Sequence, residues 1–136
     1  MMGESDPALR SRIEGKSDEL LERAERAARS VKSADLAPDQ VQELLRQAQT
    51  GWGVEHVCNW LRYQKARIEE WQRSGLADAV LKDLSDLRGE ASTIAGNLYP
   101  TEIQERLGEV WLALARRYAA YLERWYYVVY HERESE

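Results

Sequence analysis

Apolar residues recur every three or four positions along most of this chain, which is the spacing of an amphipathic α-helix. The pattern predicts an all-α fold, a single bundle of about five helices over residues 18–32, 38–50, 54–73, 76–97 and 102–131. The last helix is the longest, roughly 45 Å at a rise of 1.5 Å per residue. We therefore expect this helix to form the backbone of the bundle.

The first residues carry no comparable apolar stripe. We interpret residues 1–16 as a flexible or short N-terminal segment, in which Asp6 and Pro7 cap a first turn. Residues 17–136 then form the helical bundle domain. The N-terminus also lacks the apolar run of a secretory signal, so we expect none.

Three helix starts carry local sequence signals. Ser17 is the residue type that caps a helix N-terminus, and Pro38 suits a first helical position. Thr101 and Gln104 have the spacing of a capping box. These signals predict where the first, second and last helices begin.

The predicted third helix has two non-polar sides. One side is aliphatic, and the other is a line of larger side chains at helical spacing: His56, Trp60, Tyr63, Arg67 and Trp71. A helix that is apolar on two sides is central in its bundle or contacts a partner. We predict a partner interface that includes Trp60, Tyr63 and Trp71, with Tyr127 of the last helix. The alternative is that Trp60 and Tyr63 pack in the core.

The composition fits a globular domain with a charge-rich surface, since 43% of the 136 residues are hydrophobic and 32% are charged. Five Trp and seven Tyr stand beside no Phe, a bias typical of interfaces. Cys58 is the single cysteine, so no intramolecular disulfide forms and we expect a cytoplasmic protein. No stretch approaches the roughly 20 apolar residues that cross a bilayer, so we expect no membrane partner.

The net charge of −5 disfavours a protein that binds nucleic acid on its own, because such binding depends on neutralising phosphates. It leaves open one basic face on a subunit of a larger assembly.

We find no pattern of catalytic residues or cofactor ligands. His56 and Cys58 are two positions apart, which puts them on different faces of a helix, so we expect no metal there. The best enzymatic alternative is a magnesium-dependent helical nucleotide pyrophosphohydrolase, with carboxylate pairs such as Asp83 and Asp86. Carboxylates at this spacing are also common on solvated helix faces. We therefore expect a non-enzyme without a cofactor.

Two groups of cations are candidates for binding nucleic acid. Arg62, Lys65 and Arg67 stand close together without an intervening acid, beside aromatic residues that are able to stack on bases. The second group is a line on the last helix, Arg106, Arg117 and Arg124. Small residues between these arginines allow a phosphate chain to approach, and Arg binds phosphate through two parallel hydrogen bonds. In both groups the alternative is an ordinary solvated or ion-paired face.

Three segments resemble a known family. They are Leu36-Ala37-Pro38-Asp39-Gln40-Val41, then Trp60-Leu61-Arg62-Tyr63-Gln64-Lys65-Ala66-Arg67, and finally Trp125-Tyr126-Tyr127-Val128-Val129-Tyr130-His131. In this order they resemble the small α-helical subunit of type III CRISPR effector complexes. The chain departs from the family pattern at Asp39, where a Ser is expected, and at Trp125, where a Glu is expected.

The resemblance implies a non-catalytic structural role in a ribonucleoprotein that serves antiviral defence. Such a subunit packs on further copies of itself and on other protein subunits, and it contacts the backbone of the guide–target duplex. Transferred to this chain, the contacts would come from Arg62, Lys65, Arg67, Arg117 and Arg124. The nearest alternative is a helical protein–protein adaptor that binds no nucleic acid.

Overall fold

The computed structural model describes residues 6–33 and 35–135, and they confirm the all-α class. Seven helices are present in these ranges, against about five predicted: α1 (Pro7–Glu14), α2 (Ser17–Arg29), α3 (Pro38–Thr50), α4 (Val54–Arg67), α5 (Glu69–Arg73), α6 (Leu76–Leu98) and α7 (Ile103–Glu134). The additional helices are α1 and α5, and the other five lie close to the predicted ranges.

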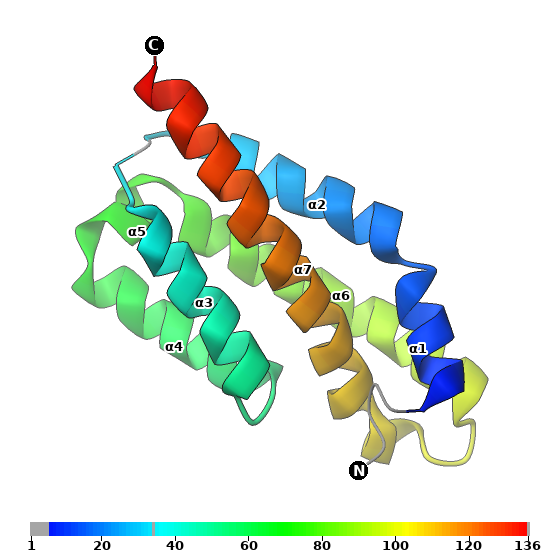
Figure 1. Cartoon of the computed structure of the whole chain (residues 1–136). Coiled ribbons are helices and arrows are strands. Elements are labelled where there is room, and N and C mark those ends of the chain that lie inside the picture. The colour runs from blue at the N-terminus through cyan, green and yellow to red at the C-terminus, as the bar shows by residue number, and fades with distance from the viewer. Residues whose placement is uncertain (1–5, 34, 136) are drawn as a thin grey trace.

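Helix α7 runs the full length of the bundle, as predicted. Helices α2 and α3 lie along its two flanks and α6 packs behind it, so that one long strip of α7 faces outward between α2 and α3 (Figure 1). The inward stripe of α7 carries buried side chains from one end to the other: Leu107, Val110, Leu114, Tyr118, Leu122, Tyr126 and Val129. This stripe gives the bundle a single continuous core.

The N-terminal segment is better packed than the sequence predicted. Leu9 and Ile13 of α1 are completely buried against the core, so of the two predicted alternatives, flexible or short, the segment from Asp6 onward is short and packed, with Asp6 as its cap. The Asp6 carboxylate caps α1 by accepting a hydrogen bond from the Ala8 amide at 3.0 Å. The Tyr99 hydroxyl donates to the same carboxylate at 2.6 Å and ties α1 to the end of α6. Residues 1–5 lie outside the described residues.

This tie is expected to make stability depend on pH. The hydrogen bond from Tyr99 holds the pKa of the Asp6 carboxyl below its usual range, against the opposing effect of burial. A lowered pKa contributes stability above about pH 4 that is lost as the pH falls through the folded-state value. Tyr99→Phe should therefore lower the melting temperature near neutral pH, with a deficit that shrinks in acid. The same deficit at every pH would contradict the assignment.

The predicted third helix is broken in two. Ile68 adopts an extended conformation (φ −115°, ψ 110°), which separates α4 from α5. The break turns Trp71 inward, where its side chain is 0% exposed and its indole Nε1 donates to Gln40 Oε1 at 3.3 Å. The prediction that Trp71 contributes to a partner interface is therefore wrong.

Two predicted caps are also wrong. Lys16 precedes the first residue of α2, and Glu102 precedes α7, and neither helix has a side-chain capping bond. Pro38 does occupy the start of α3, as predicted. The first residues of α2 and α7 therefore lack the side-chain caps that the sequence suggested.

A charged network joins α2 to α6 within the bundle. The Arg23 guanidinium lies 3.4 Å from Asp83, 3.4 Å from Asp86 and 3.1 Å from Glu90, and its side chain is only 15% exposed. The Tyr118 hydroxyl of α7 donates to Asp83 at 2.6 Å. Burial raises the pKa of the Asp83 and Glu90 carboxyls, and it raises that of Tyr118 well above its usual value. The carboxylate pair considered for magnesium is thus already bound by a cation.

Candidate nucleic-acid interface

The outward strip of α7 gathers three arginines around a hollow of about 390 Å³. The hollow is lined by Gln49 of α3 and by five residues of α7: Arg116, Arg117, Ala120, Tyr121 and Arg124. We call this lining the arginine surface. Among the described residues that line this surface there are three cations and no carboxylate, although the whole chain carries a net charge of −5.

The three arginines are held to different degrees. Arg116 Nε donates to the Ala48 carbonyl at 2.9 Å, in the last turn of α3, where carbonyls lack partners within the helix. Arg117 is partly buried and reaches Ser17 Oγ at 3.5 Å, which is a weak contact. Arg124 is exposed and forms no hydrogen bond or ion pair within the part of the chain that the structure describes. Arg117 and Arg124 therefore have most of their donors available to a ligand.

The predicted line of arginines does not extend to Arg106. Its guanidinium lies 3.7 Å from the centre of the Tyr99 ring, and it also contacts Glu109 and Asp6. The Arg106 side chain is only 13% exposed. It therefore belongs to the packing of α1 against α7, and the arginine surface begins at Arg116.

The other predicted cation group does not form one patch. Lys65 turns toward α6 and pairs with Asp78 at 2.7 Å, and Arg62 lines a separate small hollow beside Arg88. Arg67 lies on the side of α4 that faces α3, where it lines a groove. Successive residues of a helix rotate by about 100°, so cations close in sequence point in different directions. The structure brings Arg117 and Arg124 together, and it separates Arg67 from Arg62 and Lys65.

The aromatic residues predicted to meet a partner fall into two groups, one exposed and one packed against the core. Tyr63 and Tyr127 are 59% and 51% exposed, and Tyr127 packs on His131 with ring centres 4.3 Å apart. Trp60 is partly buried and meets Trp71 edge to face at 6.2 Å. Trp52, in the turn between α3 and α4, is 91% exposed and is an aromatic residue that the sequence analysis did not single out.

An apolar groove adjoins the arginine surface along α7. It is lined by Leu21 of α2 and by Tyr121, Arg124, Trp125 and Val128 of α7. Leu21 and Val128 are 40% and 41% exposed, which is high for aliphatic side chains. The groove shares Tyr121 and Arg124 with the arginine surface, so the two form one continuous face.

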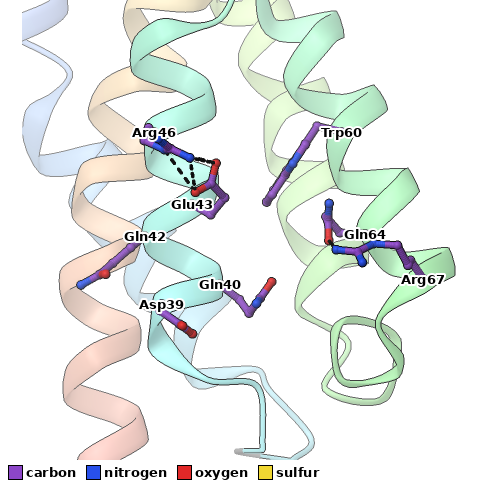
Figure 2. Close-up of a pocket in the computed structure, with 8 residues that line it drawn as sticks. All are labelled: Asp39, Gln40, Gln42, Glu43, Arg46, Trp60, Gln64 and Arg67. Atoms are coloured by element: carbon purple, nitrogen blue, oxygen red, sulfur yellow. Dashed lines mark hydrogen bonds and ion pairs between the residues drawn. The ribbon is translucent and has the colours of Figure 1, made fainter.

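The groove between α3 and α4 brings together two of the predicted residues, Trp60 and Arg67. Asp39, Gln40, Gln42, Glu43 and Arg46 line it from α3, and Trp60, Gln64 and Arg67 from α4 (Figure 2). The Glu43 carboxylate accepts hydrogen bonds from Nε and Nη2 of Arg46 and from the Gln47 amide. Sequence reasoning missed the glutamines, because an isolated Gln on a helix carries no recognisable signal.

No three or more His, Cys, Asp or Glu side chains within residues 6–33 and 35–135 are arranged to hold a metal ion. Burial raises the pKa of the Cys58 thiol, and His56 is exposed on another side of α4. None of the helices over these same ranges has the length and apolarity of a membrane span.

Comparison of the chain with protein-family models, with curated proteins and with solved structures gave no match in any of the three.

Proposed function

We propose that this chain is a non-catalytic structural subunit that contacts the sugar-phosphate backbone of nucleic acid through the arginine surface of α7. The observation that carries the proposal is the gathering of Arg116, Arg117 and Arg124 around one hollow with no carboxylate in its described lining. Arginine binds phosphate groups through paired hydrogen bonds.

The local shape supports the same assignment. Ala120 and Tyr121 both line the hollow between Arg117 and Arg124, and the small Ala120 side chain leaves room for a phosphate chain on its side. The two arginines are seven positions apart, about 10 Å along the helix axis. That spacing allows each to meet a different phosphate, and contacts of this kind position a duplex without reading its sequence.

The assembly is inferred from sequence resemblance rather than from the site. The segments around Leu36–Val41, Trp60–Arg67 and Trp125–His131 resemble the small subunit of type III CRISPR effector complexes. In such a cytoplasmic ribonucleoprotein, neighbouring protein subunits would offset the chain's net charge of −5 and would carry the nuclease activity. Further copies of this chain and the backbone subunits would be its protein partners.

The proposal predicts the effect of removing two charges. Arg117→Gln with Arg124→Gln should weaken binding of a short RNA duplex at low salt by about tenfold or more, since each phosphate contact contributes separately. Fluorescence anisotropy with a labelled duplex measures the affinity. The matched control is Lys82→Gln with Arg88→Gln, which removes the same charge from exposed positions of α6. Equal losses in the two double variants would indicate a general charge effect and contradict a specific surface.

A helical protein–protein adaptor is the second candidate, and the apolar groove beside Trp125 favours it. An adaptor that binds no nucleic acid predicts no measurable duplex binding by the wild type at low salt. It also predicts that Leu21→Ser, at an exposed position of the groove, disrupts assembly with protein partners while Arg117→Gln with Arg124→Gln does not.

A further inference from the structure

The groove between α3 and α4 has the size and lining of a small-molecule site. Its volume is about 590 Å³, within the roughly 300–1,000 Å³ typical of ligand pockets. Gln40 and Trp60 point into it from opposite helices, and Gln64 lies beside Trp60 (Figure 2). Gln64 is only 6% exposed, so a polar amide lies largely buried at the base of the groove.

The orientation of both amides follows from their partners. Gln40 Oε1 accepts from the Trp71 indole at 3.3 Å, and Gln64 Oε1 accepts from the Arg67 guanidinium at 3.2 Å. An indole N–H and a guanidinium are donors only, so in each amide the oxygen must face the partner and the NH₂ group must face away. Neither NH₂ group has a hydrogen-bond partner among the described residues. The groove therefore presents two sets of donors that the protein leaves free for the acceptors of a ligand.

The remaining lining restricts the ligand further. The charges in the groove balance, because Asp39 and Glu43 oppose Arg46 and Arg67. A neutral ligand therefore fits better than a carboxylate or a free phosphate. Trp60 supplies an aromatic wall, partly buried and fixed by its contact with Trp71. Unpaired bases are held in this way, by an aromatic ring together with hydrogen bonds to their edges.

We propose that this groove binds a neutral, planar base that carries carbonyl groups, namely the uracil of an unpaired nucleotide. The uracil ring lies against Trp60, and its two carbonyl oxygens accept hydrogen bonds from the side-chain amides of Gln40 and Gln64. Uracil carries two carbonyl acceptors, whereas cytosine replaces one of them with an amino donor. The amino group would face an amide donor, so the groove favours uracil. This site shares no residue with the arginine surface, so a test of uracil binding here is independent of the proposal that the arginine surface binds a nucleic-acid backbone.

The test is a nuclear magnetic resonance titration of the full chain with uridine and, separately, with cytidine. Uridine should shift the Trp60 indole signal and the side-chain amide signals of Gln40 and Gln64. Cytidine should bind about five- to tenfold more weakly, the factor expected for one unmade hydrogen bond. Shifts that are equal for the two nucleosides, or that are absent from these three side chains, would overturn the proposal.

Gln40→Glu and Gln64→Glu make the test specific. Each variant keeps the oxygen that Trp71 or Arg67 requires and replaces the unused donor with an acceptor. At least one of them should reverse the preference, so that cytidine binds more tightly than uridine. Gln72→Glu, at an exposed position of α5 that does not line the groove, makes the same charge change and should leave the preference unchanged. A preference for uridine that survives in both groove variants would overturn the assignment of the amides.

Discussion

Trp71→Ala is expected to lower the free energy of unfolding by about 3–5 kcal/mol, the range for truncating a large buried aromatic side chain. The side chain of Trp71 is completely buried, and its removal leaves a cavity among α3, α4 and α6. The substitution also removes the donor to Gln40 and the edge-to-face packing on Trp60. Urea denaturation followed by circular dichroism measures the change.

Trp52→Ala is the matched control, because Trp52 is 91% exposed in the turn before α4. Exposed substitutions usually change stability by less than about 0.5 kcal/mol. If the two variants were equally stable, Trp71 would not be a core residue. That result would contradict the break at Ile68. It would favour the uninterrupted helix over residues 54–73 that the sequence predicted, with Trp71 on its outer side.

Arg23→Ala is expected to cost about 3 kcal/mol, the lower end of the range for removing one partner of a buried ion pair. The substitution leaves the Asp83 carboxylate partly buried without its cation, and Glu90 with only Lys16 at 3.4 Å. The Tyr118 hydroxyl does not replace the missing charge, since it supplies a single neutral hydrogen bond. Urea denaturation near neutral pH measures this change in stability.

The pH dependence of this variant follows from the pKa of Asp83. Burial raises that pKa in the folded protein, and removal of Arg23 raises it further. A folded-state pKa above the unfolded value of about 3.9 favours folding at low pH, and this contribution declines as the pH rises through the folded value. The deficit relative to wild type should thus be largest near neutral pH and smaller in acid.

Two variants serve as controls for this network. Arg26→Ala removes an exposed arginine from the same helix and should change stability little. Adding Asp83→Asn to Arg23→Ala should recover part of the stability, because the uncompensated charge is removed. A deficit for Arg23→Ala that does not change with pH would contradict the proposed role of the carboxylates.

The long helices were predictable because their apolar stripes extend over many turns. α6 begins at Leu76 as predicted and ends one residue beyond the predicted 76–97. The break at Ile68 was not predictable, since neither Gly nor Pro marks it and Ile is compatible with a helix. α1 was underestimated because two buried residues, Leu9 and Ile13, are too few to establish a period in sequence.

In the candidate sites too, some features were predictable from helical spacing and others depend on tertiary packing. The spacing of Arg117 and Arg124 on one uninterrupted helix was enough to place them together. Arg106 falls on the same helix face by its spacing, but its position over Tyr99 depends on where α1 packs, which only the tertiary structure supplies. The pairing of Gln40 with Trp71 across α3 and α5 is equally non-local. Periodicity thus predicts which residues share a helix face, and tertiary packing decides which of them remain available to a ligand.

The central claim is that Arg117 and Arg124 contact phosphates, and the salt dependence of duplex binding tests it most directly. The slope of log affinity against log salt concentration counts the phosphates that are neutralised. Arg117→Gln with Arg124→Gln should reduce the magnitude of that slope by about 2, roughly one for each arginine replaced, while Lys82→Gln with Arg88→Gln leaves it unchanged. A slope identical to that of the wild type in the Arg117 and Arg124 variant would contradict the account.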